Sequence, residues 1–459
     1  MDQALLLSRL QFAWVVALHI LLPAFTVGLA SYIAVLEGTY FFSRRPLFLT
    51  LSRYWLRIFA VSFGMGVVSG IVMPFQFGTN WSRYSEITAG ITGPLMGYEV
   101  LTAFFLEAGF LGILLFGREK VPPAVHFAAA IMVAAGTLLS TFWILSANSW
   151  MQTPAGYTIE NGRFIPSDWF AAIFNPSFPY RLVHTTLAFY ITTAFAVIGV
   201  AAWHLRRRQH IDESLMMQKM GFGLLAILVP LQVFVGDQHG LNTLEHQPVK
   251  IAAMEANWET QDHMPLLLFA WPDEKAERNA VEIAIPDLGS LILRHSVNGK
   301  VPGLKDWKPE DRPPVAIPFF SFRLMVGIGV VMLALVIGGL VFWKRGTLAT
   351  AYRFHALCIA AMPLGFIAVV AGWVTTEVGR QPWVVYGLLR TQDAVTPSLT
   401  TGDVVLSLLV YVVAYIVIFG SGIYFLARLA RTGLDKPPPG VHQPFATPAR
   451  PLSGATRAN

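Results

Sequence analysis

Four side chains that can bind iron lie within or beside long apolar stretches of the sequence: His19, His184, Met325 and Glu377. Ionisable groups are costly in lipid, so such residues are candidates for function. Histidine and methionine are axial ligands of haem iron, a His/Met pair suits electron transfer, and a carboxylate can also bind iron. Arg323 lies two residues before Met325, where a buried arginine needs an anion such as a haem propionate. The pattern predicts more than one redox centre.

Each of these residues also has a purely structural interpretation. His19 can pack with its ring bonded to a neighbouring carbonyl, and His184 can be an interfacial residue at the start of a helix. Methionine in an apolar helix mostly fills space. Glu377 can be an interfacial carboxylate that pairs with Arg380. The haem interpretation therefore rests on the four residues occurring in separate spans and in the same, outer half of the membrane.

Two carboxylates, Glu99 and Glu107, are eight residues apart in another apolar stretch. In an α-helix this spacing leaves about 80° between them, so both lie on one broad face. Two carboxylates on one buried stripe predict a proton relay, which Ser140 of the next span could extend. The alternatives are pairing of the carboxylates with buried cations and a bond from Ser140 to its own i−4 carbonyl.

The elements that carry these residues are predicted to be membrane helices. Of the 459 residues, 54% are hydrophobic and 13% are charged, against about 25% charged in soluble proteins. A span needs roughly 20 apolar residues and must satisfy its own backbone. The chain is therefore predicted to be an all-α integral membrane protein with nine transmembrane helices. The predicted spans are 11–36, 54–76, 94–116, 124–146, 184–204, 217–236, 316–343, 355–377 and 404–427.

Basic residues follow every odd-numbered span, and Lys and Arg mark the cytoplasmic side of a membrane protein. The clusters are Arg44, Arg45 and Arg53; Arg118 and Lys120; Arg206, Arg207, Arg208 and Lys219; Lys344, Arg345 and Arg353; Arg428, Arg431 and Lys436. The N-terminus is predicted to be periplasmic and the C-terminus cytoplasmic. The net charge of +6 reflects this asymmetry, and no nucleic-acid partner is predicted. The first apolar run is too long for a cleavable signal.

The predicted organisation has four parts. Residues 1–236 hold helices one to six, 237–315 form a long periplasmic loop, 316–435 hold helices seven to nine, and 436–459 form a disordered cytoplasmic tail. Cys358 is the single cysteine, so neither an internal disulfide nor a Cys-x-x-Cys-His haem attachment is possible.

Several stretches, in order and at the family's spacing, resemble subunit I of cytochrome bd-type quinol oxidases. They are residues 8–13 (SRLQFA), 75–81 (FQFGTNW), 103–107 (AFFLE), 147–152 (ANSWMQ), 321–327 (SFRLMVG) and 379–383 (GRQPW). The resemblance covers all nine predicted spans. Together these motifs are far more specific than any one of them.

The resemblance implies three haems in this subunit: haem b558, haem b595 and haem d. His184 and Met325 would ligate the low-spin haem b558, with Arg323 near it. His19 and Glu377 would serve the high-spin haems, and which of the two ligates haem d is left open.

The resemblance also implies roles for residues around these ligands. Trp373 would lie between haems, and Arg9 and Arg380 would help to bind them. Lys250 and Glu255 would form the quinol site in the loop 237–315. Glu99, Glu107 and Ser140 would bring protons from the cytoplasm.

Two departures from the long-loop members of the family resemble its cyanide-insensitive branch. The loop lacks their insertion, and Pro74 stands where some members have a glutamate. In that branch a further haem b can take the place of haem d.

The activity implied is a quinol:oxygen oxidoreductase of the bacterial cytoplasmic (inner) membrane. Quinol would be oxidised at the periplasmic side and oxygen reduced to water with cytoplasmic protons, generating proton motive force without pumping. The implied partners are a second oxidase subunit, a single-helix small subunit, membrane lipid, oxygen, and ubiquinol or menaquinol. Two other classes stay open: a proton-coupled transporter, although no internal repeat is visible, and a haem b anchor that passes electrons to another subunit.

Overall fold

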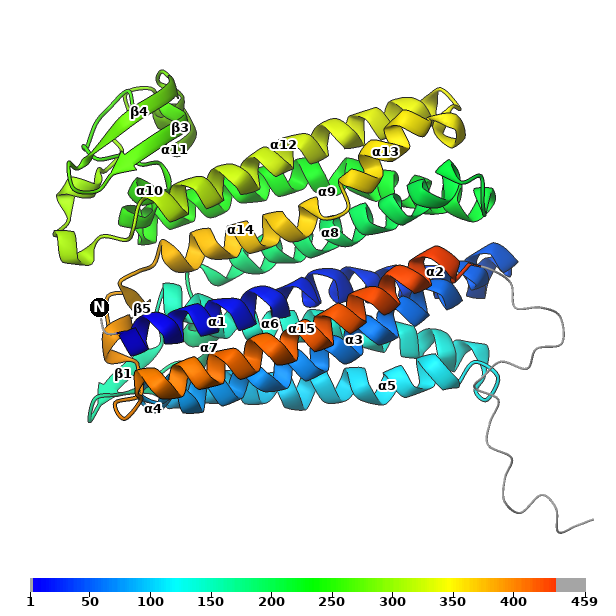
Figure 1. The fold of residues 1–459 in the computed structure, drawn as a ribbon, viewed down its shortest axis with the longest axis horizontal. Helices are drawn as coiled ribbons and strands as arrows, with labels where there is room; N and C mark the ends of the chain where they lie inside the picture. Colours follow the sequence, from blue (N-terminus) through cyan, green and yellow to red (C-terminus); the bar gives the residue numbers. More distant parts are fainter. Residues whose placement is uncertain (1–2, 435–459) are drawn as a thin grey trace, which may run out of the picture.

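The computed structural model describes residues 3–434 and consists of long helices that run side by side (Figure 1). Within this part of the chain nine helical segments are long and apolar enough to cross a membrane, which confirms the predicted number. They are residues 3–43, 46–79, 82–116, 123–152, 169–206, 211–246, 316–344, 352–378 and 401–432. The predicted tail, residues 436–459, and Lys436 lie outside the described residues.

Six of these segments contain one long α-helix each. They are α3 (Pro46–Thr79), α6 (Pro123–Gln152), α8 (Phe178–Arg206), α9 (Ile211–His246), α12 (Ala316–Lys344) and α15 (Thr401–Thr432). The helix α9 ends ten residues beyond the predicted boundary at Gly236, so the following loop begins at Gln247. Pro74, the residue that departs from the long-loop pattern, lies inside α3.

The other three segments are interrupted. The first divides into α1 (Gln3–Leu21) and α2 (Pro23–Ser43), the third into α4 (Ser82–Tyr98), a π-helical turn (Glu99–Phe104) and α5 (Phe105–Phe116), and the eighth into α13 (Tyr352–Ala360) and α14 (Leu364–Val378). Pro23 and Pro363 stand at two of these breaks, because proline lacks the N–H that a continuing helix needs.

The connecting segments contain short elements that the sequence pattern did not predict. Three two-stranded antiparallel sheets pair β1 (Tyr157–Glu160) with β2 (Arg163–Pro166), β3 (Leu266–Asp273) with β4 (Arg278–Ile285), and β5 (Trp383–Val385) with β6 (Leu389–Arg390). Two short helices of these connections are α10 (Pro248–Met254) and α11 (Leu288–Arg294), while α7 (Trp169–Ile173) precedes α8 within the fifth segment. The predicted long loop is therefore a folded unit of α10, the β3–β4 hairpin and α11.

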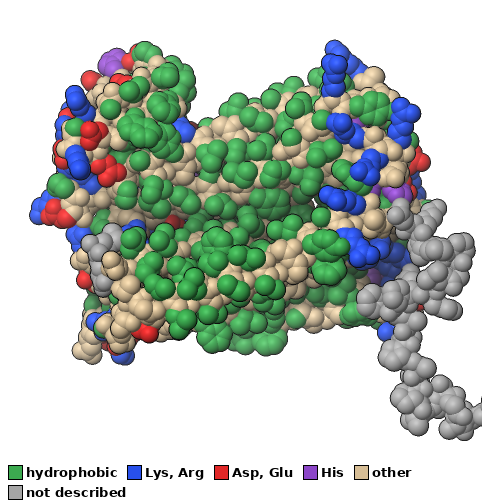
Figure 2. Space-filling model, viewed as in Figure 1, with side chains coloured by type: hydrophobic (Ala, Val, Ile, Leu, Met, Phe, Trp, Pro, Cys, Tyr) green, Lys and Arg blue, Asp and Glu red, His purple; other side chains and the backbone are tan. Residues whose placement is uncertain are grey.

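The bundle has two chemically different ends. The β3–β4 hairpin and the start of α1 lie at one end, here called the hairpin end, while α15 finishes at the other (Figure 1). Figure 2 shows Lys and Arg gathered at that second end, here called the basic end, with a broad apolar belt between the two. This separation agrees with the basic clusters that set the predicted orientation.

The helices pack so that α14 lies at the centre of the candidate site. It contacts α1, α8 and α12, while α8 also packs along α9 and α2. Around these contacts the core is made of large apolar side chains, with Trp55, Phe59 and Phe195 almost fully buried. Many apolar side chains of α15 remain exposed, such as Leu406 and Val417. That exterior suits a lipid environment or a second membrane subunit.

Candidate functional site

The four predicted iron ligands lie on helices that α14 joins. Glu377 is on α14, and α14 packs against α1 with His19, α8 with His184 and α12 with Met325. The sulfur of Met325 faces Gly372, where an added Cβ would come within 2.8 Å of it.

All four residues lie in the half of the bundle nearer to the hairpin end. His184 lies six residues after the start of α8, Met325 nine after the start of α12, and Glu377 one before the end of α14. His19 contacts Ser69, ten residues before the end of α3. At 1.5 Å per residue, each lies within about 15 Å of a helix end.

His19 has the tautomer that a metal ligand needs. Its Nδ1 lies 2.9 Å from Ser69 Oγ, and that hydroxyl donates to the carbonyl of Gly66 at 3.1 Å. Because the serine hydrogen is used there, His19 Nδ1–H donates to Ser69 and Nε2 keeps a lone pair. A ring nitrogen held in this way orients the other nitrogen for a metal.

His184 lies against two polar residues of α9. Gln232 Nε2 is 3.3 Å from its Nδ1 and 3.2 Å from its backbone carbonyl. The ring of His239 stands edge-on to it at 5.4 Å between centroids. Sequence reasoning missed both α9 residues, although His239 follows Gln232 at a spacing of seven, which keeps them on one helical face.

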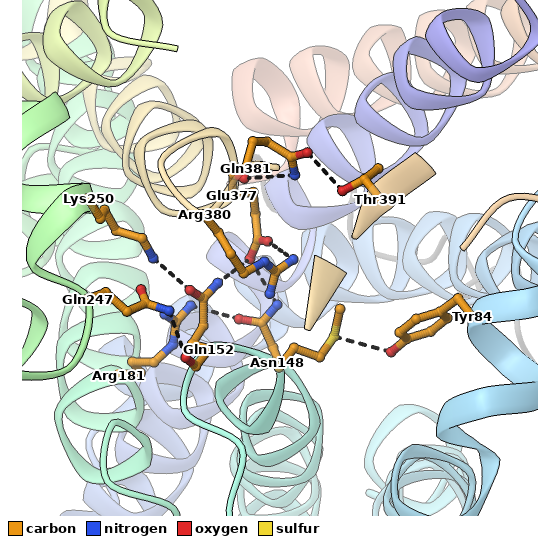
Figure 3. A network of polar contacts seen from close by, with 11 residues as sticks. Tyr84, Asn148, Gln152, Arg181, Gln247, Lys250, Glu377, Arg380, Gln381 and Thr391 are labelled. Carbon is orange, nitrogen blue, oxygen red and sulfur yellow. Dashed lines mark hydrogen bonds and ion pairs between the residues drawn. The ribbon is translucent and has the colours of Figure 1, made fainter. Parts of the chain in front are cut away.

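Glu377 belongs to a network of polar side chains that connects α14, α6, α8 and α10 (Figure 3). Its carboxylate is ion-paired with Arg380 and accepts from Asn148 Nδ2 at 3.0 Å and Gln152 Nε2 at 3.4 Å. Asn148 Oδ1 in turn accepts from Arg181 at 2.7 Å. The alternative pairing of Glu377 with Arg380 is thus present in this structure.

The arginines of the network retain unused donors. Arg380 is 5% exposed and Arg181 8%, yet Nε and Nη1 of Arg380 and Nε of Arg181 have no hydrogen-bond partner within the described part of the chain. Buried donors without partners are rare, and a carboxylate satisfies guanidinium donors well. The donor-only character of this set fits the propionates of a haem.

Lys250 joins the same network from α10. It is 3% exposed, and its ammonium group donates to Gln152 Oε1 at 2.6 Å. Burial, followed by the positive charges of Arg181 and Arg380, lowers the pKa of Lys250 well below its ordinary value, while Glu377 opposes this shift. Lys250 is therefore poised to exchange a proton beside Gln152.

Lys250 and Glu255, the two residues predicted to form the quinol site, have different partners in the structure. The carboxylate of Glu255 instead pairs with Arg323 of α12 at 2.6 Å. Arg323 Nε also donates to the carbonyl of Leu267 at 2.7 Å, and its guanidinium lies over the ring of Phe319. In this structure Arg323 ties the folded loop to the bundle, and its predicted place near a haem propionate stays a prediction.

Glu99 and Glu107 both face α6. Ser140 Oγ donates to Glu99 at 2.7 Å, so Ser140 does reach across to the neighbouring span. The side chain of Glu107 fills the space beside Gly136, where an added Cβ would meet its Cγ. Gly136 and Ser140 are four residues apart and therefore share one face of α6.

The π-helical turn explains this alignment and corrects the predicted geometry. Its defining bond runs from the Phe105 N–H to the carbonyl of Val100, five residues earlier. One residue is thereby absorbed without advancing the helix, so the angle between Glu99 and Glu107 falls from about 80° to roughly 20°. The two carboxylates are closer to one line than a continuous α-helix allows.

Trp373 and Arg9 are the remaining predicted site residues. Trp373 is half-buried on α14, next to the Gly372 that faces Met325. Arg9 is half-buried on α1, one residue after the fully buried Ser8. Among residues 3–434 no three His, Cys, Asp or Glu side chains lie together as a metal site. Iron held in a porphyrin needs only axial ligands from the protein.

Asn148 and Gln152 were missed as candidate site residues. Both lie in the stretch 147–152 and are four residues apart on α6. This spacing puts two amides on one face near a helix end, a signal that the sequence contains.

Fold and site together define a class: a helical integral membrane protein whose buried donors suit haem. Residues 7–434 match the family described as Cytochrome bd terminal oxidase subunit I. The chain therefore belongs to the cytochrome bd terminal oxidase subunit I family, and it is a multi-pass haem-binding subunit of the inner membrane. This membership excludes the transporter alternative.

Known proteins are similar to this chain over nearly its whole length. Cytochrome bd ubiquinol oxidase subunit 1 of Bacillus subtilis is 34% identical over 442 residues, covering 94% of each chain. Cytochrome bd-II ubiquinol oxidase subunit 1 of Escherichia coli is 33% identical, covering 93% of this chain and 96% of that one. The solved bd oxidase of Geobacillus thermodenitrificans superposes with a TM-score of 0.86 at 30% identity, covering 94% of this chain and 99% of that chain.

Proposed function

We propose that this subunit oxidises quinol near Lys250 and Glu255 and passes the electrons to haems held by His19, His184, Met325 and Glu377, where oxygen is reduced to water. The observation that carries the proposal is the donor-only guanidinium set of Arg380 and Arg181 beside Glu377. Family membership and relatives named as ubiquinol oxidases support it.

The proposed cofactors are haem b558, haem b595 and haem d, or a further haem b in place of haem d. His184 and Met325 would hold haem b558, and His19 and Glu377 the high-spin pair. When bound, the haems supply the one-electron chemistry and the oxygen site. In this proposal Ser69 orients His19, Arg380 neutralises charge, and Trp373 would lie between the haems.

Quinol oxidation releases two protons with two electrons, so its hydroxyl groups need acceptors. In the proposed site Lys250 and Gln152 would bind one end of the quinol, and Glu255, held by Arg323, the other. The low pKa of Lys250 supports a role in accepting a proton. One relative is named as a menaquinol oxidase and two as ubiquinol oxidases, so competition between the two quinols for this site is the measurement that identifies the ring type.

Protons for oxygen reduction would come from the basic end, which we assign to the cytoplasm. Glu107, then Glu99 with Ser140, would pass them along the α5–α6 contact. The hairpin end would face the periplasm. Because electrons and protons arrive from opposite sides, charge separates without a pump. A second subunit is expected to cover part of the apolar exterior, and a single-helix small subunit is proposed as a further partner.

The test is a pair of measurements on the purified complex. Reduced-minus-oxidised spectra should show low-spin and high-spin haem, and quinol-driven oxygen uptake should be sensitive to Glu377→Gln, with loss of high-spin absorbance. A Glu377→Gln variant with normal spectrum and oxygen uptake contradicts the assignment. A complex that takes up haem and quinol but not oxygen supports the electron-transferring anchor instead.

A further inference from the structure

A seam of polar side chains runs between α1, α3 and α15 from the hairpin end toward His19. Gln11 Oε1 accepts from Asn80 Nδ2 at 3.0 Å and from Ser407 at 3.2 Å. His19 and Ser69 form the next direct link along α1 and α3. Ser8 and Gln11 of the stretch 8–13, and Gln76, Asn80 and Trp81 of the stretch 75–81, have no role in the quinol and haem assignments.

The three helices are in register along this seam. Ser407 is level with Gln11, and α1 and α15 both start at the hairpin end, so Tyr415 is level with His19, eight residues further along each helix. The contact of Gly422 with Met65 agrees with the same alignment. Gln76 lies one turn below Asn80, between these two levels.

Most polar atoms of the seam lack partners. Ser8, Gln11 and Gln76 are 0% exposed and Tyr415 is 2% exposed. Their unpaired atoms are Ser8 Oγ, Gln11 Nε2, both amide atoms of Gln76, Trp81 Nε1 and Tyr415 Oη, counted over the described residues. Each such group destabilises the fold if it stays dry. Six in one narrow region require an explanation.

The chemistry of these atoms selects the ligand. Around Arg380 only donors are unused, which suits an anion, whereas the seam offers both donors and the acceptor Gln76 Oε1. Water donates and accepts, so it satisfies both kinds, and a carboxylate satisfies donors only. No charged side chain is among the unpaired groups of the seam.

The spacing also suits water. Along the helices, Ser8 and Gln11 are about 4.5 Å apart, Asn80 and Gln76 about 6 Å, and Gln76 and the Ser69 that contacts His19 about 10.5 Å, which two waters in succession would bridge. One bridging water spans two polar groups roughly 5.5–6 Å apart. The path from Ser8 to His19 covers eleven residues of α1, about 16 Å. The rings of Phe12 and Phe77, 5.9 Å apart, form its apolar wall.

We propose that this seam holds a single file of ordered water, through which water formed beside His19 leaves toward the hairpin end. The inference rests on the proposed position of His19 at the pair of high-spin haems where oxygen is reduced. There, one oxygen molecule takes four electrons and four protons and gives two water molecules, which must leave an otherwise apolar interior. Protons enter along α5 and α6, so entry and exit use different helix contacts.

Hydroxyl-radical footprinting of the whole complex tests the water file without reference to activity, since radicals formed from ordered water label adjacent side chains. Tyr415 and Phe77 should be labelled several-fold more than Tyr54, which is 1% exposed in α3 but away from the seam. Gln76→Leu, which keeps the volume and removes both polar atoms, should abolish the difference. Gln218→Leu, in α9, is the control, because Gln218 is also fully buried with an unpaired amide.

Steady-state kinetics test the exit role. Gln76→Leu should lower kcat for oxygen reduction several-fold while the KM for quinol and the haem spectrum stay unchanged, and Gln218→Leu should not. Labelling of Tyr415 no greater than that of Tyr54 overturns the water file. A labelled seam with normal turnover in Gln76→Leu overturns the exit role. Either result in a wild-type complex with haem absorbance and quinol oxidase activity leaves the proposed function standing.

Discussion

Replacing Arg323 with methionine should loosen the folded loop from the membrane bundle. Arg323 Nη2 pairs with Glu255 at 2.6 Å, and its Nε donates to Leu267 at 2.7 Å. These bonds join α12 to the segment after α10 and to β3. A hydrogen bond of a charged group contributes about 1.5–3 kcal/mol. Because Arg323 keeps 16% side-chain exposure, the lower value applies, and the two bonds together contribute about 3 kcal/mol.

A loss of about 3 kcal/mol raises the local opening equilibrium roughly a hundredfold. Hydrogen exchange followed by mass spectrometry should therefore show amide exchange in residues 250–270 faster by about two orders of magnitude. The KM for quinol should rise, since Glu255 loses the partner that positions it. Haem absorbance should persist, because Met325, two residues further along α12, faces Gly372 of α14 and not the loop that Arg323 binds.

The matched control is Arg312→Met. Arg312 makes a similar pair with Glu277 at 2.7 Å and donates to the Trp307 carbonyl at 2.8 Å. Its loss should speed exchange near those residues only and leave the quinol KM unchanged. If Arg323→Met instead removes low-spin haem absorbance without changing exchange in 250–270, the arginine serves a propionate and its role in anchoring the loop is refuted.

Three further predictions concern single residues. Glu377→Gln should reduce high-spin haem absorbance because Arg380 loses its buried counter-charge. The control is Glu86→Gln, which breaks exposed ion pairs with Arg83 and Arg163 and should change neither the haem spectrum nor the activity. Glu107→Gln should lower the rate of oxygen reduction by at least about a hundredfold while the haem content is retained. Glu119 is exposed at the basic end, and Glu119→Gln should leave the rate unchanged. Equal rates for the two variants would rule out the proton relay. Burial lowers the pKa of Lys250 in the folded chain. Between this lowered pKa and about 10.4, the pKa of an unfolded lysine, the unfolded chain therefore binds more protons than the folded chain, and the free energy of unfolding rises with pH. Thermal melts should rise more steeply between about pH 7 and 9 in wild type than in Lys250→Met, and identical slopes would show that Lys250 is charged in the fold.

The sequence was sufficient to predict the membrane spans because their number depends mainly on the length of apolar runs. Proline at 23 and 363 also marked two helix breaks, although these were not predicted. The sequence did not predict that α9 extends to His246, because Asp237, His239 and Glu245 are residues typical of a loop. Tertiary packing against α8 keeps this polar turn helical, which overrides local preference.

The site was predicted only in part for a similar reason. Lys250 and Glu255 are close in sequence, but α10 ends at Met254, so Lys250 points to Gln152 and Glu255 to Arg323. The direction of each side chain depends on a partner about 70 to 100 positions away in the sequence, and no local sequence pattern predicts such a partner. Asn148 and Gln152 have the spacing of one helical face, but their side chains are uncharged. They were therefore not predicted as site residues beside the charged Glu377.

The π-helical turn at Glu99–Phe104 lets the third span hold one extra residue without losing the alignment of its two acids. Deleting one residue within the turn would restore regular α geometry and leave Glu99 and Glu107 seven residues apart, still within roughly 20° of one line. A regular α-helix that kept every residue would instead turn them about 80° apart, so that only one would face Gly136 and Ser140. The alignment of the two acids thus depends on the shape of the backbone between them and on no further reactive side chain.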